Sequence, residues 1–198
     1  MLQEILKLAT DKQHQDLEQM MFVNKIMDGT LSVEEYKEIL QTNYIVHALL
    51  EQQLYDSVNP ELQDELEINK RRKLPALLKD LDELNIDPQE IELQNKETFI
   101  TANNATVLGA MYVLEGATLG GNVIVKKLKV NPNLQSLNLG FHYYQVYGAD
   151  LGKNWKQFLH VLNTKISEEN YPISVNSALT VFEYFSTSQK GTFSQLAI

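Results

Sequence analysis

Residues 107–123 read VLGAMYVLEGATLGGNV, an apolar stretch of helical character that carries four glycines. Glycine costs about 1 kcal/mol relative to alanine inside a helix, so this many glycines need a compensating role. On a helical wheel Gly109, Gly116 and Gly120 lie close together and would leave a bare strip of backbone. Either another helix packs closely on that strip, or a flat ligand lies against it. The adjacent Gly120 and Gly121 also permit a kink, which packing alone does not require.

The N-terminal residues 2–22 are predicted to form one helix with two distinct faces. The face expected in the core consists of Leu2, Ile5, Leu6, Ala9 and Met20. The stripe beside it consists of Lys7, Thr10, His14, Leu17 and Met21. His14 is therefore either a buried histidine with a satisfied hydrogen bond, or an iron ligand for a flat apolar group whose anionic edge meets Lys7. Glu18, four residues after His14, is placed to contact the imidazole and fix its tautomer.

The remaining sequence is helical in pattern, so we predict an all-α, multihelical fold of roughly eight helices in a single domain, residues 1–198. Ser32 and Glu35 form a capping-box signature for a helix that is expected to end before Asn59-Pro60. A long helix containing the glycines is predicted over residues 96–129. The other helices are expected over residues 61–69, 75–84, 141–147, 151–167 and 173–189.

The composition narrows the classes of function. The 198 residues are 43% apolar and 22% charged, as in ordinary globular proteins. Cysteine is absent, which excludes disulfides, thiolate metal sites and a cysteine nucleophile. The net charge of −9 argues against nucleic acid or an anionic membrane surface as the partner. The N-terminus lacks a signal-peptide pattern and the apolar stretch 105–125 is expected to be a buried helix, so we predict a cytoplasmic protein without membrane insertion.

Together, the two unusual stretches resemble the heme oxygenase family. Residues 7–18, KLATDKQHQDLE, are similar to the proximal helix of that family, and residues 112–121, YVLEGATLGG, to the distal helix of its bacterial branch. Further matches follow the family's order along the chain and comprise residues 71–75 with Asp80-Leu81, Tyr147-Gly148, and Trp155-Lys156 with Phe158. The resemblance spans most of the chain and depends on this ordered combination. It implies a fold in which heme lies between the proximal helix and a kinked, glycine-rich distal helix.

The resemblance also implies the residues that bind heme. His14 would be the neutral axial ligand of the heme iron, Lys7 would pair with a propionate, and Tyr112 would hydrogen-bond one. Lys156 matches a position that carries a basic residue near the propionates. An acidic chain that binds a dianionic heme must concentrate its few cations at this edge, so Lys7 and Lys156 are the residues expected there.

The distal wall would be formed by Gly116, Gly120 and Gly121, which are the candidate catalytic positions. Glycines supply backbone, space and water where a strong acid–base side chain would favour early cleavage of the O–O bond. The sequence departs from the animal enzymes at two places. Ala117 stands where they have an aspartate that organises distal water, and His160 stands where they have an arginine near a propionate. The first departure is usual in bacterial relatives, and the second affects how heme is seated.

The implied activity is oxidative cleavage of heme at a meso carbon to biliverdin, iron and carbon monoxide, with heme as both substrate and cofactor. The reaction needs O2 and an external electron donor such as a ferredoxin or a reductase. The basic run Lys70–Lys73, ordinarily a solvated loop, is a candidate docking site for an acidic donor. The meso position cleaved, the donor, the oligomeric state and the purpose stay open, the last being iron acquisition or biliverdin supply to a bacteriophytochrome pathway.

Four alternatives accompany this interpretation. A heme carrier or sensor of the same fold would use the same ligands without degrading heme. A thiaminase-like enzyme on this fold lacks its cysteine nucleophile here. A ferritin-like di-iron bundle needs Glu-x-x-His motifs, and no histidine has a glutamate three residues before it. A helical interaction module would bind no heme. We expect His47 and His142 to be packing residues. His160, one turn beyond Lys156, either has no part in binding or assists at a propionate.

Overall fold

The computed structural model describes residues 1–93 and 99–196, with side chains up to residue 189. Every regular element within these ranges is a helix, as predicted. The α-helices are α1 (Leu2–Ala9), α2 (Asp11–Met20), α3 (Val23–Asp28), α4 (Val33–Asp56), α5 (Pro60–Leu66), α6 (Leu74–Glu83), α7 (Asn104–Gly116), α8 (Gly121–Lys129), α9 (Leu151–Lys165) and α10 (Tyr171–Leu196). The 3₁₀ helices are η1 (Ile68–Arg71), η2 (Pro88–Glu90), η3 (Gln135–Leu137), η4 (Tyr143–Gln145), η5 (Gly148–Asp150) and η6 (Glu168–Asn170).

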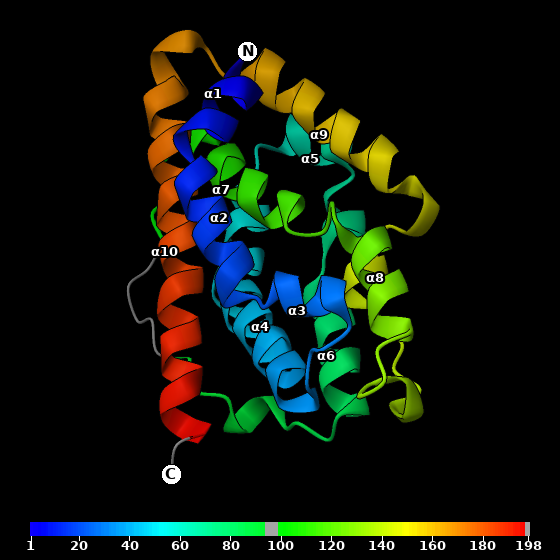
Figure 1. The fold of residues 1–198 in the computed structure, drawn as a ribbon. Coiled ribbons are helices and arrows are strands. Elements are labelled where there is room, and N and C mark those ends of the chain that lie inside the picture. Colours follow the sequence, from blue (N-terminus) through cyan, green and yellow to red (C-terminus); the bar gives the residue numbers. More distant parts are fainter. Residues whose placement is uncertain (94–98, 197–198) are drawn as a thin grey trace.

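Helix α10 runs along one side of the molecule (Figure 1) and packs against α7, α4, α2 and α1. Helix α4 contacts α6, α7 and α10, so it links the two sides of the bundle. Helix α9 lies across one end and contacts α1, α5 and α7. Helix α8 lies on the side away from α10 and packs against α3 and η4 (Figure 1). The buried apolar side chains form one connected core among these helices.

The single helix predicted over residues 2–22 is divided at Thr10, which ends α1 and precedes α2. Helical bonding partly continues across the break, because Thr10 N donates to Leu6 O and His14 N donates to Thr10 O. The Thr10 hydroxyl also donates to Leu6 O at 2.8 Å, and such side-chain bonds compete with a regular helix. The prediction was therefore right about helical character and wrong about continuity.

The predicted core face of this N-terminal segment is only half correct. Leu2 and Leu6 are fully buried, whereas Ile5 is 41% exposed and Ala9 is exposed. Helix α1 contacts α9 and α10, and the side chains of Leu2 and Leu6 occupy that contact. Among the residues that the structure describes, only a narrow strip of α1 is covered, so the wider apolar face inferred from the wheel is left open there.

The other predicted helices agree with the structure to different degrees. Ser32 caps α4 as predicted, since its hydroxyl accepts from Glu35 N at 3.2 Å and the Glu35 carboxylate accepts from Ser32 N at 2.9 Å. Helices α6 and α9 fall where they were expected. Within the predicted helix over residues 141–147, the structure has only the short 3₁₀ helix η4, and η5 follows it at Gly148–Asp150. Helix α10 extends beyond the predicted residue 189.

The long helix predicted over residues 96–129 begins later and is interrupted. Residues 96–98 lie outside the described ranges, and α7 starts at Asn104, where the Asn103 side chain caps it by accepting from Thr106 N at 3.0 Å. Residues 117–120 form a turn between α7 and α8, so the predicted kink is confirmed. The segment Asn104–Lys129 is long and apolar enough to cross a membrane by length and composition, and 56% of its most apolar window is buried.

Helix α7 approaches α10 very closely. A Cβ at Gly109 would lie 2.3 Å from Ser174 O on α10, so no larger residue fits at this crossing. The Ser174 hydroxyl donates to Ala105 O at 2.8 Å, and the Ser177 hydroxyl donates to Thr106 O at 2.5 Å. For Gly109, close helix packing is therefore the explanation, and α10 fixes the position of α7 in the bundle.

Candidate functional site

His14 lies on α2 with 62% of its side chain exposed, so it is not a buried, satisfied core histidine. Its Nδ1 is 3.8 Å from Glu18 Oε1, which is an ion-pair distance but too long for a hydrogen bond. Leu17 beside it is half-buried, and Met21 is buried. An exposed imidazole above partly covered apolar side chains is suited to ligate the metal of a flat apolar group, through the nitrogen that does not face Glu18.

The two lysines predicted to bind the anionic edge of the ligand make no ion pair within the described residues. Lys7 on α1 and Lys156 on α9 are both exposed, and neither has an ion-pair partner within residues 1–93 and 99–189. His160, one turn after Lys156, is exposed as well. These side chains are available to a ligand with negative groups, although no contact within the protein assigns them to one.

Tyr112 is half-buried on α7, and its ring centroid is 5.6 Å from that of Trp155 on α9. Trp155 immediately precedes Lys156, so this contact brings Tyr112 close to the helix that carries the lysine. Burial raises the pKa of Tyr112, which keeps its hydroxyl protonated and able to donate a hydrogen bond. The structure therefore brings Tyr112 and the Lys156 helix together, as a shared anionic ligand edge would require.

The glycines of the turn after α7 have different surroundings. A Cβ added to Gly116 would meet no atom within 4 Å, and one added to Gly120 would touch only the flexible side chain of Ile124 at 3.4 Å. A Cβ added to Gly121 would lie 2.2 Å from Tyr144 O, so Gly121 is required for packing against η4. Gly116 and Gly120 are thus the positions with open space beside the backbone, where a flat ligand would fit.

A cluster of buried charges surrounds Glu115, next to this turn, and shows that the prediction of a solvated basic loop was wrong for two of its residues. Arg71 and Lys73, predicted to lie in a solvated basic loop, are 1% and 0% exposed. Both bind the fully buried carboxylate of Glu115, with Arg71 Nη1 at 2.7 Å and Lys73 Nζ at 2.6 Å. Tyr147 donates a third hydrogen bond to the same carboxylate at 2.7 Å. These two cations are unavailable to a docking protein, because they neutralise a charge that the apolar helix α7 carries into the core.

A second buried carboxylate completes the cluster. Glu51 on α4 accepts hydrogen bonds from the backbone N of Lys73 and of Leu74, at 2.9 and 3.1 Å, and pairs with His47 Nδ1 at 2.9 Å. Burial lowers the pKa of His47, in opposition to the adjacent carboxylate. His47 is a packing residue, as predicted, but the network around it was not foreseen. Glu115, an acidic residue inside an apolar stretch, was the signal in the sequence that buried cations had to be near.

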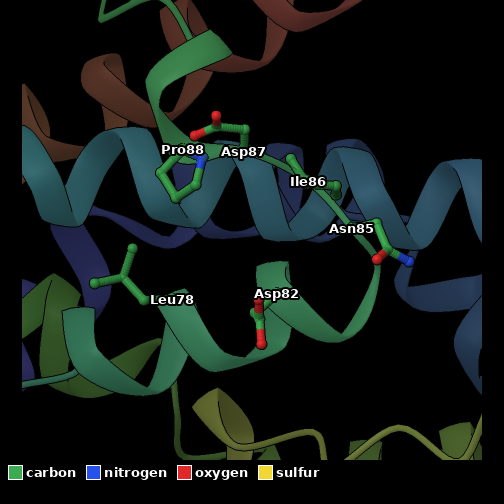
Figure 2. A pocket seen from close by; sticks show the side chains of 6 residues that line it. All are labelled: Leu78, Asp82, Asn85, Ile86, Asp87 and Pro88. Carbon is green, nitrogen blue, oxygen red and sulfur yellow. The ribbon is translucent and has the colours of Figure 1, made fainter.

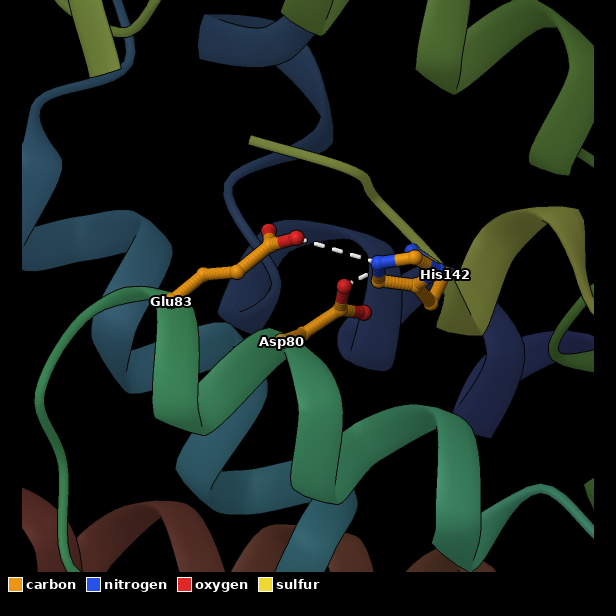
Figure 3. Close-up of side chains that lie close together, drawn as sticks. All are labelled: Asp80, Glu83 and His142. Carbon is orange, nitrogen blue, oxygen red and sulfur yellow. Dashed lines mark hydrogen bonds and ion pairs between the residues drawn. The ribbon is translucent and has the colours of Figure 1, made fainter. Parts of the chain in front are cut away.

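Asp80, Glu83 and His142 form a separate cluster between α6 and η4 (Figure 3), with ligand-type atoms within 4.8 Å of one another. Each of these groups already has a protein partner. The Asp80 carboxylate accepts from His142 N and Tyr143 N at 2.7 and 2.8 Å, and Glu83 binds His142 Nε2 at 3.0 Å and Gly140 N at 2.7 Å. Burial raises the pKa of Asp80 to about 6, although these backbone bonds oppose the rise. The cluster serves as a clamp that attaches η4 to α6.

A surface hollow of about 480 Å³ lies beside the C-terminal end of α6 (Figure 2). Its lining residues are Leu78, Asp82, Asn85, Ile86, Asp87 and Pro88. The lining includes two carboxylates and no cation, so it would repel a ligand with negative groups. The hollow is therefore a poor candidate for the anionic ligand that Lys7, Tyr112 and Lys156 favour.

Comparison with known proteins agrees with this geometry. The family model described as heme oxygenase matches residues 1–189, nearly the whole chain. The chain belongs to the heme oxygenase family. A heme oxygenase of Xanthomonas campestris pv. campestris (strain 8004) is 27% identical over 161 residues, which cover 80% of this chain and 91% of that protein.

Solved structures of heme oxygenases share the fold. The enzyme of Neisseria meningitidis, determined with NO and CO bound, has a TM-score of 0.74 at 21% identity and covers 98% of this chain and 92% of its own. Heme oxygenase-1 of Synechocystis sp. PCC6803, in complex with heme, has a TM-score of 0.77 at 17% identity, with coverage of 99% and 94%. Heme oxygenase from Leptospira interrogans has a TM-score of 0.74 at 18% identity, with coverage of 95% and 98%. At these identities the likeness establishes the fold.

This heme oxygenase therefore acts on heme, which is its substrate and cofactor. The chain's own residues fit that group. An exposed imidazole, an open strip of backbone at Gly116, a protonated Tyr112 hydroxyl and two free lysines match a flat, apolar, dianionic iron porphyrin. Helices α2 and α7, which carry the imidazole and the open backbone, both pack on α10 and are held in one framework (Figure 1).

Proposed function

We propose that this heme oxygenase binds heme between α2 and the turn that joins α7 to α8, where the imidazole of His14 would hold the heme iron. Lys7, Tyr112 and Lys156 bind the propionates, and the backbone at Gly116, Gly120 and Gly121 forms the distal wall. The observation that carries this proposal is the pairing of an exposed His14 with open space at Gly116, on two helices that share α10 as their support.

In this site the heme supplies the redox chemistry when bound. His14 would hold the heme iron through its imidazole, and Glu18, whose Oε1 is 3.8 Å from Nδ1, would orient the ring through a bridging water. Gly116 lets the helix backbone approach one side of the ring without a side chain that could exchange protons. Tyr112 donates a hydrogen bond to a propionate, and the lysines fix the orientation of the ring. The apolar contacts provide much of the affinity, as in most cofactor sites.

Product identification tests this function directly. Purified protein is mixed with hemin, ascorbate as reductant, and air, and the heme spectrum and products are followed. We expect loss of the Soret band, formation of biliverdin and release of iron. A heme spectrum that persists without biliverdin would favour a heme carrier of the same fold, and failure to bind hemin would overturn the site altogether.

The electron donor is proposed to be an acidic protein that docks on α8. The outward side of α8 and the residue that caps its C-terminus carry Val123, Lys126, Lys129 and Val130, all exposed, and we call these four residues the α8 face. On a chain of net charge −9, an acidic donor is repelled by most of the surface and attracted to such a local group of cations. Helix α8 starts at Gly121, directly after the distal turn, so this face is near the proposed heme site. We also propose that the enzyme works in the cytoplasm.

Charge reversal on the α8 face tests the docking site. We expect Lys126→Glu with Lys129→Glu to raise the apparent KM for a reduced acidic ferredoxin by roughly tenfold, with less difference from wild type at high salt. Turnover with ascorbate should not change, because a small reductant needs no docking surface.

The matched control reverses Lys70 and Lys79, two exposed lysines outside the α8 face. This control should leave the KM for ferredoxin much closer to that of wild type. Equal KM values in the two double variants would contradict docking at α8 and indicate only a general effect of net charge.

A further inference from the structure

We propose that Glu115 is a positioning residue of the reaction, whose buried carboxylate fixes the distal turn against α9 and thereby determines which meso carbon of heme is cleaved. The inference deepens the proposed function and rests on the heme site described there. Glu115 does not touch that site directly. It is the last residue before Gly116, and its side chain points into the core, where it is 2% exposed.

Three donors hold the Glu115 carboxylate from different elements. Oε2 accepts from Arg71 Nη1 and from the Tyr147 hydroxyl, each at 2.7 Å, and Oε1 accepts from Lys73 Nζ at 2.6 Å. Burial by itself would raise the pKa of Glu115, but Lys73 and Arg71 lower it below its ordinary value, so the group stays ionised. With both oxygens occupied, the final turn of α7 cannot rotate without breaking a buried ion pair.

Arg71 extends this hold to α9. Its Nη2 donates to Asn154 O at 3.1 Å, and its guanidinium lies 5.8 Å from the ring centroid of Phe158. Phe158 stacks on Trp155 with ring centroids 5.7 Å apart, and Trp155 in turn contacts Tyr112 on α7. The end of α7 and the start of α9 are therefore joined twice, by the ion pair through Arg71 and by the aromatic contact.

The charges of the cluster balance, with Arg71 and Lys73 opposite Glu115 and Glu51. Such buried clusters rarely add net stability, because desolvation offsets the Coulomb attraction, and apolar residues of similar size often serve as well. Their best-supported use is to select one arrangement of the elements that they join. Here those elements include the wall of the proposed heme site and the helix of its propionate-binding lysine, which indicates a positional role.

The position of α7 relative to α9 affects which meso carbon is cleaved. The rotation of the heme in its own plane is set by the residues that bind its propionates and by the part of the protein that leaves room beside the ring. In the proposed site Tyr112 and Lys156, together with Lys7, hold the propionate edge, and the open backbone at Gly116 determines which part of the ring has room beside it. Glu115 connects both, since it adjoins Gly116 and reaches Asn154, two residues before Lys156, through Arg71. A rotation of the α7 end relative to α9 would present a different meso carbon to the open side.

The test compares Glu115→Gln with Glu51→Gln in the hemin-reconstituted enzyme. Both variants remove one carboxylate from the same cluster, but only the first lies on α7. We expect both to lower the thermal midpoint. Glu115→Gln should raise the share of minor biliverdin isomers several-fold and shift the CO stretching frequency of the ferrous CO complex, while Glu51→Gln should keep the wild-type values.

The double variant Glu115→Gln/Lys73→Met tests whether the change in biliverdin isomers is independent of the loss of thermal stability. It removes one of the two cations that faced Glu115, so that Arg71 and Glu51 again balance in charge, and we expect it to unfold closer to the wild-type midpoint while the isomer shift persists. A folded double variant with the wild-type isomer ratio would overturn the proposal, as would an equal shift in Glu51→Gln. Heme binding and turnover of the wild type are read in the same assay, so a failure of the heme site itself would be seen separately.

Discussion

Replacing His14 by alanine is expected to abolish the histidine-ligated heme spectrum and to lower turnover by roughly 100-fold or more, since loss of outer partners of metal ligands alone costs 10–100-fold. The fold should survive, because the side chain is 62% exposed and its closest charged neighbour, Glu18, is 3.8 Å away. Substitutions at such surface positions usually change the free energy of unfolding by less than about 0.5 kcal/mol. Resonance Raman and absorption spectra of the hemin complex, together with biliverdin formation, measure the effect.

His160→Ala is the matched control, because His160 is also an exposed histidine but lies on α9. It should keep the histidine-ligated heme spectrum and change heme affinity by much less than His14→Ala does. Added imidazole should restore part of the spectrum to His14→Ala by occupying the vacated position. An unchanged spectrum in His14→Ala would show that another group ligates the iron.

The general form of the fold could be predicted from the sequence, because the signals for helices are local. The spacing of apolar residues and the Ser32–Glu35 capping box depend on neighbours along the chain, and the structure confirms helices there. The kink after α7 was also predictable, from the adjacent Gly120 and Gly121, whereas the break at Thr10 depends on a side-chain hydrogen bond to Leu6 O, and the roles of Gly109 and Gly121 depend on the fit to α10 and η4. Those interactions are not encoded in a helical wheel.

The environment of the basic run was the largest error, and it has a physical cause. Arg71 and Lys73 are buried because Glu115, more than forty residues later, is brought beside them by the packing of α7. A window around residue 71 contains no trace of that partner, so a solvated loop was the reasonable expectation. The glycines likewise looked equivalent in sequence, although Gly109 and Gly121 are needed for packing and Gly116 is not.

This difference among the glycines gives the second large prediction, which concerns Gly116→Leu. We expect turnover to fall by at least roughly tenfold, equivalent to about 1.4 kcal/mol of lost transition-state stabilisation. The side chain would occupy the space beside the backbone where the ring and oxygen must fit. The protein should nevertheless be at least as stable as wild type without heme, because a Cβ at this position meets nothing within 4 Å and glycine is a poor helix former. Chemical denaturation of the heme-free protein and hemin turnover measure the two effects separately.

Two alanine variants serve as controls for Gly116→Leu, for which we expect turnover to fall while the stability of the heme-free protein does not. Gly152→Ala, on α9, also meets nothing within 4 Å, so it should gain stability and keep activity. Gly121→Ala places its Cβ 2.2 Å from Tyr144 O, so it should lose stability, and any loss of activity would follow from that. Of these three positions, only Gly116 should show the two measurements moving in opposite directions, because among the three it alone has open space that belongs to the proposed heme site. A Gly116→Leu enzyme with wild-type turnover would mean that heme lies elsewhere, and the pairing of His14 with this turn would have to be abandoned.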